Sequence, residues 1–149
     1  MSLGPAFSVD LAVVPEDAAS RLPTGRLRRA VEAALESEGV REAEISLALM
    51  NDESMERLNR QHLDRSGPTD VLAFGLGAPD APPLGDIYVG WETAQRQARE
   101  FDVELEEELV RLTIHGVLHV LGYDHPEGDG REESDHFRRQ EALVRRVMG

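Results

Sequence analysis

The chain has 149 residues, 40% hydrophobic and 30% charged, a composition typical of a soluble globular domain rather than a disordered chain. A formal net charge of −13 argues against binding nucleic acid through a broad basic surface, and the absence of cysteine excludes disulfides and thiolate metal ligands. No apolar run is long enough for a membrane span and the first residues lack a signal-peptide pattern, so we expect a cytoplasmic protein.

The first third of the chain has the pattern of a strand, a helix and a second strand. Apolar residues alternate over residues 7–13, which predicts a strand. Helical spacing over residues 26–38 predicts a helix, with Thr24 as a candidate N-cap and Gly39 as the expected stop. Alternation returns over residues 45–49. This order favours a parallel strand pair joined by a right-handed crossover.

The next segment predicts one helix and two more strands. Asn51 or Asp52 can cap a helix that runs to about Leu63. A continuous apolar run within residues 69–74 predicts a third strand, and residues 86–89 predict a fourth. The Gly- and Pro-rich loop between these two strands is long for a tight hairpin, but we expect them to pair antiparallel.

Three further helices are predicted over residues 91–101, 104–121 and 132–148, and Trp91 is expected to anchor the core rather than to stack on a base. The sequence has neither internal repeats nor a linker. We therefore expect residues 1–149 to form a single domain in which about four strands pack against about five helices.

The segment HGVLHVLGYDH, residues 115–125, carries the chemistry. His115 and His119 are four residues apart, which places both imidazoles on one face of a helix. Gly122 can end that helix and turn the chain back, so that His125 reaches the same point in space. Three neutral imidazoles predict a metal site with a fourth position left open for water, as in catalytic zinc sites.

The same helix has a separate apolar stripe for packing, so its histidine face can line a cleft. That stripe comprises Ile114, Val117, Leu118 and Leu121. One zinc ion is the expected metal, although imidazole also suits nickel, copper and iron. A divalent ion with three neutral ligands keeps its full charge and strongly lowers the pKa of bound water.

The histidine spacing also matches the ligand pattern of metzincin proteases. Those enzymes have glutamate directly after the first histidine, where it acts as the general base for peptide hydrolysis. Here that position is Gly116, which has no side chain. The sequence therefore argues against a peptidase while keeping the metal scaffold.

The motif HGVLHVLGYDH resembles the signature of the YbeY family, metal-dependent endoribonucleases that act in ribosomal RNA maturation. GPTDVLAF at residues 67–74 resembles the PTDVLSF strand of that family, and LGDI at residues 84–87 resembles its LGDI strand. The pair Leu58-Asn59 and the pattern Phe137-x-x-Gln140 also fall at family-like places. The resemblance thus covers the chain from about residue 58 to its C-terminus.

The resemblance implies an α+β fold with a small mixed sheet and a zinc-binding helix like that of zincins. It also implies cleavage of single-stranded ribosomal RNA, with the ribosome or small-subunit proteins as partners. One position departs from the family. Members commonly have arginine four residues after the Asn of the LN pair, as a phosphate ligand, whereas this chain has Leu63. Arg60 or Arg65 could supply the charge instead, or transition-state stabilisation could rely on the metal.

Three carboxylates are candidate catalytic groups. Asp70 and Asp86 lie in the two strands expected to border the cleft, where either could orient a ligand histidine or act as a base. A strand-end cap or turn carboxylate is the structural alternative for both. Asp124 adjoins His125 and could either fix the turn or contact substrate.

Two histidines outside the motif, His62 and His136, are expected at the surface. Two other functions stay open at this point. One is a zinc hydrolase of another substrate, peptides included. The other is a ribosome-associated assembly or binding factor in which the metal is mainly structural.

Overall fold

The computed structural model describes residues 4–63, 69–122 and 130–149. Its centre is one four-stranded sheet with the strand order β1-β2-β4-β3. The strands are β1 (Ala6–Val14), β2 (Glu42–Met50), β3 (Val71–Gly75) and β4 (Leu84–Gly90). The helices are α1 (Thr24–Ser37), α2 (Asp52–Leu63), α3 (Trp91–Phe101), α4 (Leu105–Val120) and α5 (Gly130–Met148), with the short 3₁₀ helix η1 (Glu16–Arg21) between β1 and α1.

The sheet is mixed, as predicted. Strand β1 pairs parallel with β2, and β2 pairs parallel with β4. The expected antiparallel pairing of β3 with β4 is confirmed, and the amide of Leu76 still donates to the carbonyl of Leu84 beyond the end of β3. The predicted α+β class with about four strands is therefore confirmed.

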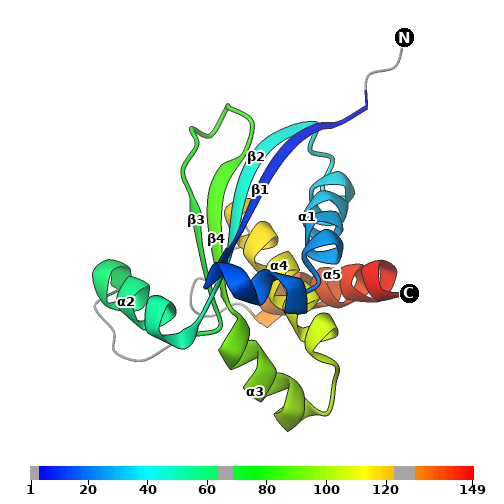
Figure 1. Cartoon of the computed structure of the whole chain (residues 1–149). Coiled ribbons are helices and arrows are strands. Elements are labelled where there is room, and N and C mark those ends of the chain that lie inside the picture. The colour runs from blue at the N-terminus through cyan, green and yellow to red at the C-terminus, as the bar shows by residue number, and fades with distance from the viewer. Residues whose placement is uncertain (1–3, 64–68, 123–129) are drawn as a thin grey trace.

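The two central strands bury one face and turn the other outward, because successive side chains of a strand alternate. The buried side chains of the two central strands include Ile45, Leu47, Leu49, Ile87 and Val89, all 0–2% exposed. Helices α1 and α4 pack against each other and against this inner face, and α5 packs on both of them (Figure 1). No helix among the described residues is long and apolar enough to cross a membrane.

Helix α2 lies at the β3 end of the sheet (Figure 1). The rings of His62 and Phe74 are 5.2 Å apart, centroid to centroid. Phe74 pairs directly with Asp86, and the next pair, Gly75 with Gly85, faces Val120 of α4. Because neighbouring pairs face opposite sides, Phe74 and the end of α2 lie on the outer face of the sheet.

At the helix starts, one expected cap is wrong and another is confirmed. Helix α1 has Pro23 at its N-cap with no side-chain cap, so Thr24 is its first residue rather than its cap. Helix α2 is capped by Asn51, whose Oδ1 accepts from the Ser54 amide at 3.0 Å. The 3₁₀ helix η1 was not predicted, because one short turn has too few residues to show a period.

Trp91 anchors the core, as predicted. Its side chain is 8% exposed, and its Nε1 donates a 3.0 Å hydrogen bond to the carbonyl oxygen of Val14. The indole therefore ties the start of α3 to the end of β1.

Candidate metal centre

Helix α4 presents two different faces to its surroundings. Ile114, Val117 and Leu118 are 0% exposed and form part of the core. His115 and His119 lie on the same helix but are only half-buried. The predicted separation of a packing stripe from a histidine face is therefore confirmed for these residues.

The position between the two faces has no room for a side chain. A Cβ placed on Gly116 would lie 2.6 Å from Cγ2 of Ile87 in β4. The contact is equally close one turn further along α4, at Val120. A Cβ placed on Gly85 of β4 would lie 2.6 Å from Cγ1 of Val120. Glycine on either partner thus lets α4 lie close against β4. The position where metzincin proteases have their general base faces the sheet here, which strengthens the argument against a peptidase.

The helix ends where the sequence indicated. The last residue of α4 is Val120, and Gly122 has φ of +101°, a conformation that strongly favours glycine. The amide of Gly122 donates to the carbonyl of His119 at 3.0 Å. Asp124 and His125 lie outside the described residues, so the third metal ligand stays a prediction.

His115 is held by side chains of α5. Its Nδ1 is 2.8 Å from Oε1 of Gln140, and its ring centroid is 4.9 Å from that of His136. His136 is only 3% exposed, so the expectation that it lies at the surface is wrong. His62 is exposed, as expected. The difference arises because α5 turns the His136 side of its helix towards α4.

An ion-pair cluster lies next to this contact. Arg111 of α4 donates from Nε and Nη2 to the two carboxylate oxygens of Glu141 at 2.8 and 2.9 Å. The same guanidinium reaches Glu108 at 3.0 Å and Glu107 at 3.1 Å. Its hydrogen bonds lower the pKa of Glu141, whereas burial raises the pKa of Glu108 against the opposing effect of Arg111. Three carboxylates share one guanidinium, so the cluster keeps a net negative charge.

Asp70 has a structural partner. Its Oδ2 accepts from Nε2 of Gln97 at 3.3 Å, and its carbonyl accepts from the Gly90 amide at 2.8 Å. These contacts tie the start of β3 to α3 and to the end of β4. The charge of Asp70 also contributes to raising the pKa of Glu108, after the larger effect of burial. Glu108 precedes His115 by two turns, about 10 Å along α4.

Asp86 lies on the face of the sheet opposite to α4 and its histidines. Gly85 and Ile87 both face α4, so the alternation of β4 turns Asp86 to the outer face. There it opposes Ser46 and Phe74 in the neighbouring strands. The expectation that Asp86 borders the same cleft as His115 and His119 is therefore not met.

The candidate phosphate ligands are only partly described. Arg60 is exposed on α2, and its Nη2 lies 2.6 Å from Oε1 of Glu56, one turn earlier. Exposed pairs of this kind contribute about 0–1 kcal/mol, so a phosphate can compete for this guanidinium. Arg65 lies outside the described residues. Leu63 is the last residue of α2.

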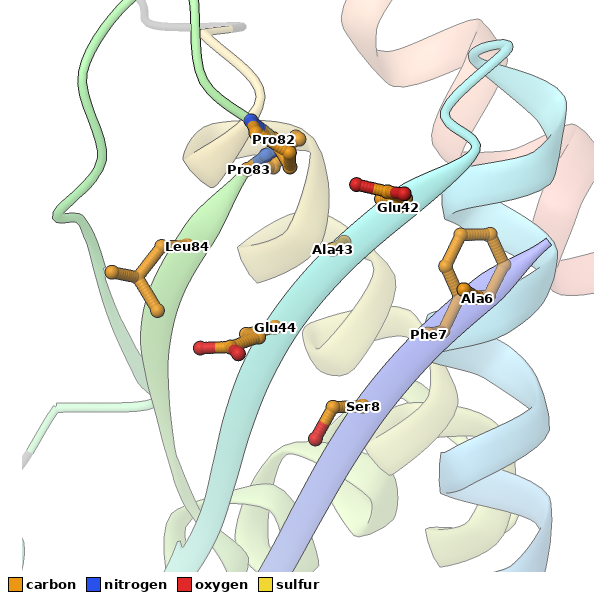
Figure 2. Close-up of a pocket in the computed structure, with 9 residues that line it drawn as sticks. All are labelled: Ala6, Phe7, Ser8, Glu42, Ala43, Glu44, Pro82, Pro83 and Leu84. Carbon is orange, nitrogen blue, oxygen red and sulfur yellow. The ribbon is translucent and has the colours of Figure 1, made fainter.

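A hollow of about 490 Å³ lies away from the histidines, at the outer face of β1, β2 and the start of β4 (Figure 2). Its lining includes the carboxylates of Glu42 and Glu44 together with Ser8 and the apolar side chain of Leu84. It contains no imidazole and no arginine, so its described lining does not fit a phosphodiester.

The sequence analysis named Gln140 as part of a family-like pattern and His136 as a surface residue, but it placed neither against His115. The buried positions of α5 include His136, Gln140, Leu143 and Val144, the i, i+4, i+7, i+8 spacing of a core-facing helix stripe. Two polar residues on such a stripe need buried partners. That pattern was the available signal for side chains that act on a neighbouring helix.

Comparison with known proteins places this arrangement in one family. Residues 16–148 match the family model described as Endoribonuclease YbeY. A protein of that name from Moorella thermoacetica is 42% identical over 130 residues, which cover 79% of this chain and 82% of the relative. Another from Roseiflexus sp. is 38% identical over 148 residues, covering 93% and 91%.

The fold is also found in a solved structure. The solution structure of a Thermotoga maritima protein superposes with a TM-score of 0.68 at 30% identity, covering 93% of this chain and 88% of the other. The family model spans strands β2, β3 and β4 together with α4 and α5, and so includes both described histidines and Gln140. By sequence match over most of its length, this chain belongs to the YbeY endoribonuclease family.

Proposed function

We propose that the chain is a zinc-dependent endoribonuclease that cleaves single-stranded RNA during ribosomal RNA processing and ribosome maturation. Its metal ligands are His115, His119 and His125. The observation that carries this proposal is the pair of half-buried imidazoles on the α4 face that is not used for packing. Membership of the endoribonuclease family supplies the substrate class.

The described donors fit a divalent transition metal. Two imidazoles one turn apart present nitrogen ligands of the kind that zinc prefers. His115 is already supported through Nδ1 by Gln140, the usual arrangement in which one ring nitrogen is held by the protein and the other faces the metal. When bound, such an ion supplies Lewis-acid chemistry, lowering the pKa of water and offsetting charge on the phosphoryl oxygens.

The chain's own residues orient the site and supply candidate groups for contacting the substrate. Close packing of Gly116 on Ile87 fixes the rotation of α4 and thereby the direction of its histidine face. Arg60 can exchange its exposed partner Glu56 for a substrate phosphate. Asp70 and Asp124 are retained as candidates for moving a proton, and Asp70 is held by Gln97.

The acidic surface gives the metal a second role. A chain with 29 acidic and 16 basic residues repels RNA at long range. Close to the site, a dication is the largest local charge and reverses that repulsion. We therefore expect RNA binding and cleavage to depend on the metal more strongly than in a basic nuclease.

The test is metal analysis and RNA cleavage with one ligand removed. Protein purified without chelators is expected to contain about one transition-metal ion per chain, and His119→Ala is expected to lose the ion and the cleavage of single-stranded RNA. His62→Ala removes an exposed histidine outside the motif and should keep both. A wild-type protein with no stoichiometric metal, or a His119→Ala variant that still cleaves normally, would contradict the proposal.

The same preparations separate the other functions. Cleavage of a peptide substrate would indicate a zinc hydrolase with another substrate. The lack of room for a side chain at position 116 argues against a peptidase. If His119→Ala loses the metal and RNA cleavage but keeps the fold and the stability of the metal-free wild-type protein, the ion is catalytic rather than structural. Product ends identify the nucleophile, because a 2′,3′-cyclic phosphate requires attack by the ribose hydroxyl.

A further inference from the structure

We propose that Gln140 is the positioning residue for the metal ligand His115, and that the Arg111–Glu141 ion pair fixes the orientation of its amide. The inference rests on the proposed metal site and deepens it. In this inference, a side chain of α5 determines which nitrogen of the His115 imidazole carries the proton.

The argument starts from the donors and acceptors around the amide. Nε2 of Gln140 lies 3.2 Å from Oε2 of Glu141, and Oε1 of Gln140 lies 2.8 Å from Nδ1 of His115. A carboxylate can only accept hydrogen bonds, so the NH₂ group must face Glu141. The amide oxygen then faces His115 and can only accept as well. Nδ1 of His115 must therefore be the protonated nitrogen.

Arg111 fixes the orientation of the Gln140 amide indirectly, because it keeps Glu141 ionised. The guanidinium binds both oxygens of Glu141, at 2.8 and 2.9 Å, in a two-pronged ion pair. The same hydrogen bonds lower the pKa of Glu141, which stays a carboxylate at neutral pH. An ionised Glu141 cannot donate, so the amide has one favourable orientation.

The consequence is a prearranged metal ligand. A neutral imidazole protonated on Nδ1 has its lone pair on Nε2, the nitrogen that can bind a metal. Gln140 is 7% exposed, and the adjacent ring of His136 is 3% exposed. The amide and the tilted His136 ring, at 52° to the imidazole, hold His115 from α5, so the ligand does not have to change tautomer or rotate when the metal arrives.

The first test reads the tautomer in the metal-free protein. Nitrogen-15 NMR of labelled protein above the histidine pKa should show His115 protonated on Nδ1, with its signals assigned by their loss in His115→Gln. Gln140→Leu removes the acceptor, and His115 should shift towards the Nε2-protonated form that predominates in solution. Gln140→Glu keeps an acceptor at the same place and should keep the Nδ1-protonated form.

The second test reads metal affinity. Competition with a chromogenic chelator should show that Gln140→Leu weakens zinc binding by about 10- to 100-fold, the usual cost of losing such a partner. Gln140→Glu should recover most of this loss, and Gln61→Leu, the same change at an exposed position of α2, should leave the affinity unchanged. Unfolding in urea checks that each variant is folded.

The outcomes separate this inference from the proposed function. If the wild-type protein binds no zinc, the proposed function fails, but the tautomer measurement still decides the role of Gln140. If zinc binds and Gln140→Leu changes neither the tautomer nor the affinity, the inference is wrong while the metal site stands. An affinity loss that Gln140→Glu does not recover would also overturn it, because a purely structural role would behave in that way.

Discussion

Gly116 lies where α4 packs against the sheet, and the lack of space around it predicts that an added side chain destabilises the fold. An added Cβ would be 2.6 Å from Cγ2 of Ile87, a β-branched side chain that is 0% exposed and cannot move away easily. We expect Gly116→Ala to destabilise the fold by about 1–3 kcal/mol through overpacking, despite the higher helix propensity of alanine. Urea unfolding of the purified variant measures this change.

Gly25 provides the matched control. It lies in the first turn of α1, and nothing lies within 4 Å of the position where its Cβ would be. Gly25→Ala should therefore leave stability unchanged or raise it by up to about 1 kcal/mol. Equal effects of the two substitutions would show that α4 is not pressed against β4 at Gly116.

At the scale of elements, Asp52 joins two helices that flank the end of the sheet. Its carboxylate accepts from Arg96 of α3 at 2.8 and 3.0 Å and from Thr93 at 3.2 Å. The hydrogen bond to Arg96 is the main cause that lowers the pKa of Asp52 below its ordinary value of 3.8. Reciprocally, the amide of Asp52 donates to Glu92 at 2.8 Å. Helix α2 is therefore held to α3 at its first residue.

This ion pair predicts a pH-dependent loss of stability. A lowered pKa in the folded state means that the carboxylate stabilises the fold above pH 3.8 and that this contribution is lost as the pH falls through the lowered value. Asp52→Asn should cost up to about 1 kcal/mol at pH 7, since the pair is partly exposed. The difference from wild type should shrink towards pH 3 in urea unfolding. Asp80→Asn, the same change in the exposed loop before β4, is the matched control and should leave the free energy of unfolding at pH 7 unchanged.

At the scale of the whole molecule, metal binding should stabilise the fold. An ion bound only by the folded state adds about 2.7 kcal/mol at 100 times its dissociation constant. For a domain of this size that raises the melting temperature by about 5–10 °C. Thermal unfolding with zinc and with a chelator measures the shift, and His119→Ala should abolish it. An equal rise in His119→Ala would place the stabilising ion elsewhere.

Much of this molecule could be predicted from local sequence pattern. The first two strands and the first long helix follow from apolar periods of 2 and 3.6, because those periods reflect which side chains of one element face the core, and β3 follows from a continuous apolar run. The spacing of His115, His119 and Gly122 is equally local. It predicted a helix with two imidazoles on one face and a stop after it, and both are confirmed.

Only the tertiary structure decided which side chains of different elements meet. Gln140 contacts His115 across 25 residues because of how α5 is rotated against α4, a rotation that neither helix specifies alone. Likewise, Asp86 belongs to the family-like LGDI motif, yet the motif does not show which face of the sheet Asp86 is on. The packing of α4 against β4 decides that. The physical reason is that a period defines the faces of an element, whereas packing between elements determines what each face contacts.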